Sequence, residues 1–169
     1  KPVAMSYAEA ISAESLGEIG SDITPDTDNF MGAYIATFAS RYIGSSLGQL
    51  KALRRETQAG ELVEALIQRT AEWLENRPGQ IAMNEIVQQN NAVTREVFRQ
   101  AGVIKLRWVT VAGNCPLCEN LDGMIVGIEQ DFAGKGDLIE AEGKAPIHVE
   151  RQVRNPPIHQ GCQCQIVAG

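Results

Sequence analysis

Two short clusters contain all four cysteines of this 169-residue chain. Cys115 and Cys118 stand three residues apart in "NCPLCENLDG", and Cys162 and Cys164 close the segment "NPPIHQGCQC" near the end of the sequence. His159, one of two histidines, lies three residues before Cys162. Thiolates and an imidazole at such spacings are typical ligands of a structural zinc ion. The sequence therefore predicts that two distant segments converge on one metal ion.

Five candidate ligands compete for the four positions of a closed zinc site. Cys162 and Cys164 would point to opposite faces of an extended strand, whereas a turn at Gln160 and Gly161 would bring His159 and Cys162 together. The expected ligands are Cys115, Cys118, His159 and Cys162. Cys164 would then lie in the core, and a site of four cysteines with His159 outside it is the alternative. A closed site leaves no position for a reacting water, which favours a structural role.

Other uses of the cysteines are less consistent with the sequence. A redox C-x-x-C also follows a strand, but the second cysteine pair and the missing β-α-β pattern disfavour it. Two disulfides would suit an extracellular protein, but no signal-peptide pattern is present. The H-x-E of His148 to Glu150 matches that of zinc deaminases, but here it follows the C-x-x-C instead of preceding it. A zinc hydrolase or a thiol oxidoreductase is therefore the less favoured interpretation, and we expect no small-molecule substrate.

The first hundred residues have the pattern of helices. Cap residues and a proline in "TPDTDN" precede a run without breakers from Phe30 to about Glu56. A second helix is expected over residues 60–76, ended by "RPG", and a third over 80–101, ended by Gly102. The third is rich in amides, which favour a polar partner surface or internal hydrogen-bond networks: Asn84, Gln88, Gln89, Asn90, Asn91 and Gln100.

Small residues recur at every fourth position of the helix that follows "TPDTDN". They are Gly32, Ala36, Ser40, Gly44 and Gly48. This spacing keeps them near one face, where small side chains let another backbone approach closely. Each glycine in a helix interior costs about 1 kcal/mol relative to alanine. The stripe therefore predicts a tight helix–helix contact, either inside the core or with a neighbouring subunit.

The hydrophobic pattern changes after Gly102. "VIKLRWVTVAG" (103–113) alternates as a β-strand does, and "GMIVGI" and "CQIVAG" predict two further short strands. Residues 129–157 predict a long loop with a short helix around "DLIEAE".

The fold class expected from these elements is α+β. An N-terminal helical half, residues 1–78, would be followed by a small β-sheet module, residues 79–169, that carries the zinc-knuckle-like Cys/His site.

The net charge of −6 gives no global attraction to nucleic acid. Residues 51–110 are an exception, with 9 basic and 7 acidic side chains. Weak nucleic-acid-binding candidates there are Arg95, Arg99, Lys105 and Arg107, although a solvated helix face is the simpler interpretation. The most apolar run, "FMGAYIATFAS", is far shorter than the roughly 20 residues of a membrane span, so we expect a soluble protein without membrane contact.

The order of motifs resembles the phage head-morphogenesis family, the Mu F-like minor capsid proteins of tailed phages. The resemblance covers about residues 80–169: an amide-rich helix, a strand with "RWVTV", "CPLCENLDG", a variable loop and "NPPIHQGCQC". Its most specific parts are W-x-T before C-x-x-C and the final P-P-x-H-x-x-C-x-C. Two positions depart from the family, which often has Thr where Asn84 stands and Arg where Gln163 stands.

The resemblance implies a structural role in head morphogenesis. Such proteins enter the phage head in few copies, associate with the portal protein and the capsid interior, and in some systems accompany DNA. It implies localisation in the virion after synthesis in the host cytoplasm. The small-residue stripe is the expected partner contact. The alternative function is a nucleic-acid-binding module that uses the basic middle helices.

Overall fold

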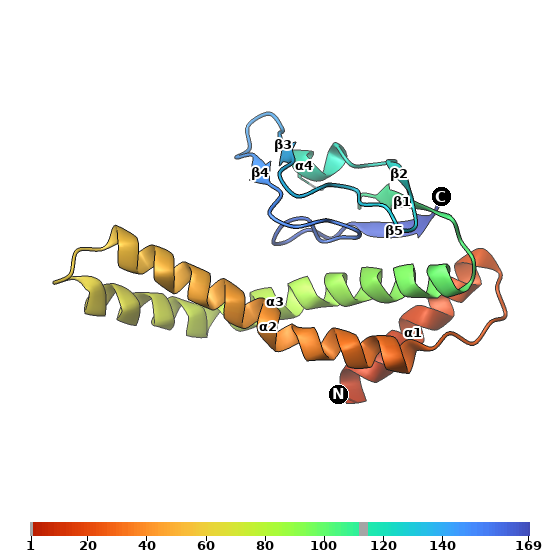
Figure 1. The fold of residues 1–169 in the computed structure, drawn as a ribbon, viewed down its shortest axis with the longest axis horizontal. Coiled ribbons are helices and arrows are strands. Elements are labelled where there is room, and N and C mark those ends of the chain that lie inside the picture. Colours follow the sequence, from red (N-terminus) through yellow and green to blue (C-terminus); the bar gives the residue numbers. More distant parts are fainter. Residues whose placement is uncertain (1, 112–114) are drawn as a thin grey trace.

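The structure is a computed structural model that describes residues 2–111 and 115–169. A base of three helices carries a small sheet module on one side of its last helix (Figure 1). This arrangement confirms the expected α+β fold, with helices first and a sheet module with the Cys/His cluster second.

α1 and the first half of α2 pack against the third helix on the side away from the sheet module, and α2 then crosses that helix (Figure 1). α1 spans Pro2–Ile19 and α2 spans Thr27–Glu56, close to the expected 30–56. α2 begins as predicted from "TPDTDN", because the Asp26 carboxylate accepts a hydrogen bond of 3.1 Å from the backbone N–H of Asn29.

The third helix, α3, is one continuous helix over Leu62–Gln100. The prediction that "RPG" separates two helices is therefore wrong, and Pro78 lies inside α3. A proline inside a helix costs about 3 kcal/mol, because it removes one backbone hydrogen bond and its ring clashes with the preceding turn. Contacts with α2 on both sides of Pro78 oppose that cost: Arg77 donates to the Tyr42 carbonyl and Glu85 pairs with Arg41. The boundary predicted between residues 78 and 79 consequently lies within this helix.

The module is built around a three-stranded antiparallel sheet. β1 spans Lys105–Val109 and lies between β2 (Ile125–Gly127) and β5 (Gln165–Ala168). All three strands were predicted, although the expected first strand, 103–113, was longer, and its residues 112 and 113 lie outside the described residues. A short helix, α4 (Pro116–Glu119), connects β1 to β2 and includes the second residue of the C-x-x-C, Cys118.

The long loop contains a small hairpin instead of the expected helix around "DLIEAE". β3 (Leu138–Ile139) pairs antiparallel with β4 (Ile147–His148). Leu138 is exposed and Ile139 is buried, so this stretch follows the alternation of a strand. Ile139 and the following segment's Val149 are buried in the core of the module, so the predicted helix around "DLIEAE" is wrong.

Two hydrophobic cores meet at α3. One lies among the helices and contains Met31, Val93 and Val97. The other fills the module around Trp108, whose ring packs edge-on against Phe132 with centroids 5.2 Å apart. The C-terminal half of α3 therefore supports both the helical base and the module.

Asn91 of α3 fixes the module on the helical base. Its side chain is 1% exposed, its Nδ2 donates to the carbonyl of Cys164 at 3.1 Å, and its Oδ1 accepts from the N–H of Ile166 at 2.8 Å. These bonds hold the start of β5, and hence the second cysteine cluster, against the helix.

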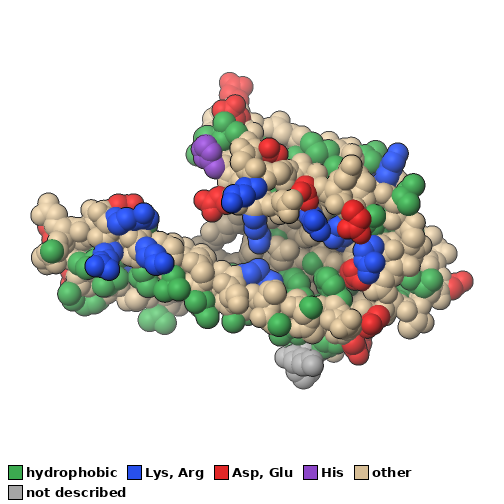
Figure 2. All heavy atoms as spheres, in the orientation of Figure 1, with side chains coloured by type: hydrophobic (Ala, Val, Ile, Leu, Met, Phe, Trp, Pro, Cys, Tyr) green, Lys and Arg blue, Asp and Glu red, His purple; other side chains and the backbone are tan. Residues whose placement is uncertain are grey.

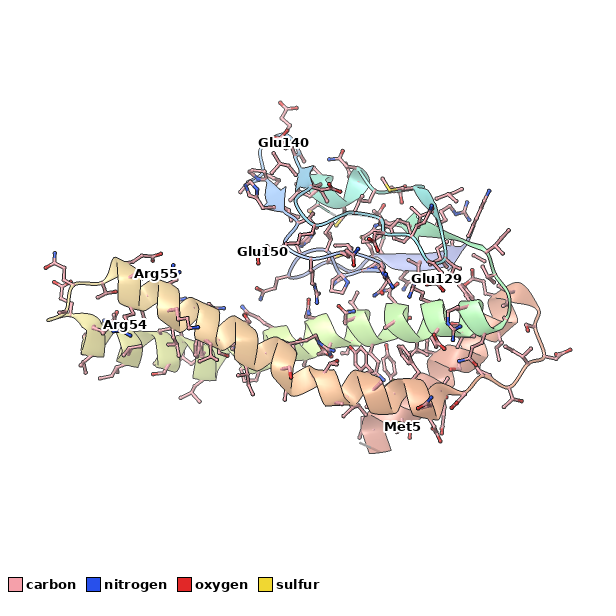
Figure 3. All side chains as sticks on the ribbon, viewed as in Figure 1. Met5, Arg54, Arg55, Glu129, Glu140 and Glu150 are labelled. Carbon is pink, nitrogen blue, oxygen red and sulfur yellow. The ribbon has the colours of Figure 1, made fainter. Side chains whose placement is uncertain are left out.

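The distal halves of α2 and α3 form a two-helix arm that extends past the module (Figure 1). Figure 3 shows Arg54 and Arg55 near the tip of this arm. No helix in the described part of the chain is long and apolar enough to cross a bilayer.

Candidate metal centre

Two short backbone motifs present the predicted ligands. Cys115 is the N-cap of α4 and Pro116 is its first residue, so the helical turn places Cys118 on the same side as Cys115. In the second segment Gly161 has a φ of 79°, and the N–H of Cys162 donates to the carbonyl of His159 at 3.2 Å. This turn is the one expected at Gln160 and Gly161, and only glycine adopts that conformation without strain.

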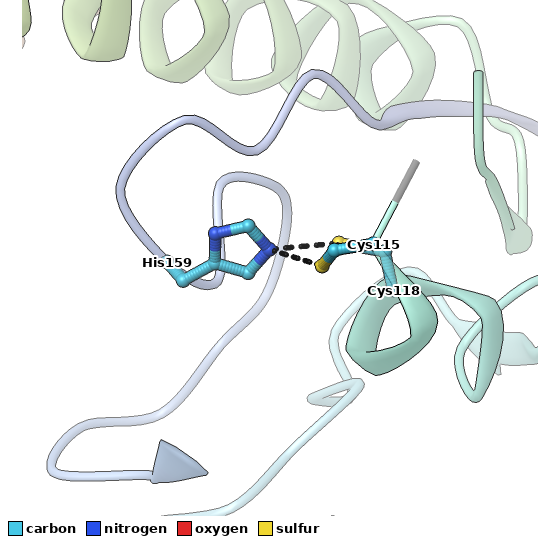
Figure 4. Close-up of side chains that lie close together, drawn as sticks. All are labelled: Cys115, Cys118 and His159. Atoms are coloured by element: carbon cyan, nitrogen blue, oxygen red, sulfur yellow. Dashed lines mark hydrogen bonds between the residues drawn. The ribbon is translucent and has the colours of Figure 1, made fainter. Parts of the chain in front are cut away.

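The two segments converge, as the sequence predicted. The Nε2 atom of His159 lies 3.1 Å from the sulfur of Cys115 and 3.0 Å from that of Cys118 (Figure 4). The Cys115 and Cys118 sulfurs are 3.7 Å apart, and those of Cys118 and Cys162 are 3.8 Å apart. Cys164 joins Cys118 and Cys162 in a second group whose sulfurs all lie within 4.8 Å of one another.

The sulfur–sulfur separations fit a tetrahedral ion. Two sulfurs at about 2.3 Å from one zinc ion and at the tetrahedral angle are about 3.8 Å apart. The distances from Cys118 to Cys115 and to Cys162 match that edge. His159 belongs to one of the two ligand groups and Cys164 to the other, and the groups share Cys118, so the choice of four ligands stays a prediction. The Cys/His cluster can hold a metal ion.

A hydrogen bond at Nδ1 of His159 leaves its Nε2 atom free to act as a metal ligand. Nδ1 lies 2.8 Å from the carbonyl oxygen of Gln160, which can only accept a hydrogen bond. Nδ1 therefore carries the proton and the lone pair of Nε2 points at the two sulfurs. Metal-binding histidines usually have such a hydrogen bond, because it fixes the ring and its tautomer.

Local hydrogen bonds also favour thiolate at two of the cysteines. Burial raises the pKa of the Cys115 thiol, but hydrogen bonds from the backbone N–H and the thiol of Cys118 outweigh it and leave the pKa below its usual value. Thiol hydrogen bonds from Cys118 and Cys164 lower the pKa of Cys162. The Cys118 thiol donates hydrogen bonds to Cys162 and Cys164, and these bonds raise its own pKa. Sulfurs this close share protons, and a bound cation would replace those protons.

None of the four cysteines, all of which are described, forms a disulfide. His148, which suggested a deaminase motif, is exposed on β4 and belongs to neither ligand group.

The four weak nucleic-acid candidates do not form one free basic surface. Arg95 pairs with Glu129 at 3.2 Å, on the side of the module that faces α3 (Figure 3), and Arg99 makes two hydrogen bonds to Glu96. Lys105 and Arg107 are exposed on β1. Two of the four charges are thus compensated inside the molecule.

The small-residue stripe faces solvent. All five of its residues are exposed, and a Cβ built on Gly32, Gly44 or Gly48 would meet no atom within 4 Å. The stripe therefore makes no tight contact with the described residues of the core, so the expected core contact is wrong, and the contact with a neighbouring subunit stays a prediction. The interior face of α2 instead carries Tyr34, Arg41 and Tyr42, which all bond to Glu85 of α3.

Sequence reasoning did not single out Asn91 or the Gln160 carbonyl as supports of the metal centre. The amide-rich composition of α3 was the available signal, but one sequence does not show which amides face inward. Internal hydrogen bonds are made by the side chains of Gln89, Asn91 and Gln100. A groove on the surface is lined by Asn84 and Gln88.

Comparisons with protein families, characterised proteins and solved structures give no match to this chain.

Proposed function

We propose that this chain is a non-enzymatic structural protein whose module is closed by one zinc ion. The observation that carries the proposal is the convergence of both segments on Cys118, whose sulfur lies 3.0 to 3.8 Å from the donor atoms of Cys115, His159 and Cys162. Three sulfurs and one imidazole suit zinc, and four protein ligands leave no place for a reacting water. The ion would join residues on either side of the long loop and so stabilise the module.

We further propose that the protein acts as a minor head protein of a tailed bacteriophage or prophage. The motif order supports this assignment, and the arm offers a surface for the portal protein or the capsid interior. Large aliphatic side chains on both arm helices are strongly exposed: Ile43, Leu47, Val63, Ile67 and Leu74. Hydrophobic side chains lie along the lower edge of the arm (Figure 2). Exposed apolar surface of this extent is typical of protein contacts.

Mass spectrometry of purified, DNA-filled heads tests this role. The protein is expected there in few copies, and a Leu74→Asp variant should enter heads less efficiently without loss of stability, because Leu74 is 80% exposed. Glu75→Asp, at the neighbouring exposed position, is the control. Absence of the wild-type protein from the heads would refute the head assignment but not the metal centre.

A further inference from the structure

A polar groove separates the arm from the loop that carries His159. Its central cavity of about 220 Å³ is lined by α2, α3 and Gln160. Two adjoining cavities share lining residues with it and lengthen it along α3, one with Asn76 and the other with Gln88 and Arg151. Figure 2 shows the molecular surface hollowed between the arm and the module.

Four amide side chains of α3 follow the groove at every fourth residue: Asn76, Gln80, Asn84 and Gln88. Four residues of helix rise about 6 Å. An extended polypeptide repeats every two residues, or about 6.6 Å. A primary amide offers both a donor and an acceptor, so successive amides can pair with the N–H and C=O of alternate residues in an extended chain. We name these four residues the amide ladder.

Most of the amide ladder has no partner within the described part of the chain. The Asn84 side chain bonds to Tyr42, but the side chains of Asn76, Gln80 and Gln88 make no hydrogen bond to other described residues. Elsewhere on α3, Gln89 and Asn91 bond to the backbones of α1 and of the second cysteine segment. The amide ladder is thus the part of α3 whose amide side chains can hydrogen-bond to a bound partner.

The charge of the groove selects among polypeptides. Arg41 and Arg69 are paired with Glu85 and Glu72. Arg77 and Arg151 have no ion pair among the described residues, and both line the groove. Arg77 is stacked on the Trp73 ring, 4.5 Å from its centroid, which holds its guanidinium in place. Two uncompensated guanidinium groups favour a segment with carboxylates.

We propose that this groove binds an extended, acidic polypeptide segment. The ladder from Asn76 to Gln88 rises about 18 Å, which corresponds to about six extended residues. A single-stranded nucleic acid fits less well, because it needs open aromatic faces for stacking. Arg77 covers one face of Trp73, and the Tyr42 ring packs against Phe38 with centroids 5.0 Å apart. This binding function goes beyond the proposed structural role and does not depend on it.

Selection from a random 12-residue peptide library on the full chain tests the proposal. Enriched peptides should contain several Asp or Glu residues, and their affinity is then measured by fluorescence anisotropy. Gln80→Ala and Gln88→Ala should each weaken binding about 3- to 10-fold, since each removes one amide pair. Both side chains lack internal partners, so these variants should fold. Gln68→Ala, on the same helix but outside the groove, is the control and should bind like the wild type.

Two results would overturn this proposal. The first is a library that yields no binder, or binders that tolerate the Gln80→Ala/Gln88→Ala double substitution. The second is binding of oligo(dT) that this double substitution abolishes while no peptide binds, which would assign the groove to single-stranded nucleic acid.

Discussion

Replacement of Asn91 by alanine should detach the module from the helical base. Asn91 makes two hydrogen bonds to the second cysteine segment and is buried, so the substitution leaves the Cys164 carbonyl and the Ile166 N–H without partners. Two lost bonds and the desolvation of the stranded groups together cost about 2–4 kcal/mol of unfolding free energy. For a chain of this size, that loss lowers Tm by on the order of 10 °C.

The matched control is Asn90→Ala. Asn90 has the same helix propensity but only a 3.4 Å hydrogen bond from the Thr94 hydroxyl. Urea unfolding followed by tryptophan fluorescence compares the two variants, and hydrogen exchange at the Ile166 amide should accelerate only in Asn91→Ala. Equal stability of Asn91→Ala and Asn90→Ala would refute the docking role of Asn91.

Three further predictions follow from the buried polar groups and the thiols. Glu85→Gln should lower the unfolding free energy by about 1–3 kcal/mol in urea titrations, because the partly buried Arg41, Tyr34 and Tyr42 lose their shared carboxylate; an unchanged midpoint would contradict this. Burial and the hydrogen bond to Glu85 raise the pKa of Tyr42 from 10 to about 12, so the folded state favours the protonated phenol. The contribution of this phenol to the stability of the folded protein is complete below pH 10 and is lost as pH rises through about 12. Tyr42→Phe should therefore flatten this pH dependence of the unfolding free energy. Cys164→Ser should keep the bound metal while Cys162→Ser loses it in elemental analysis, and the reverse result would exchange their roles.

Much of the site was predictable from the sequence. The C-x-x-C after a strand, and His159 three residues before Cys162, indicate convergence because a metal ion needs four donors and each segment supplies only part of the set. The turn at Gly161 was likewise predictable, since glycine adopts a positive φ without strain.

The errors arose where tertiary contacts override local signals. Pro78 is a strong helix breaker by itself, but near it Arg77 donates to the Tyr42 carbonyl and Ile81 is partly buried, so packing against α2 keeps α3 continuous. The small-residue stripe has the spacing of a tight contact, but spacing alone does not reveal which face of α2 meets α3. The face of α2 that meets α3 is the one that carries Tyr34, Arg41 and Tyr42, because these three side chains donate hydrogen bonds to the Glu85 carboxylate of α3.

Metal content, measured by elemental analysis on protein purified under reducing conditions, tests the metal centre most directly. We expect about one zinc ion per chain, and its removal by a chelator should lower Tm and expose the module core around Trp108. Protein that contains no metal, and whose melting a chelator leaves unchanged, would contradict the zinc-closed module.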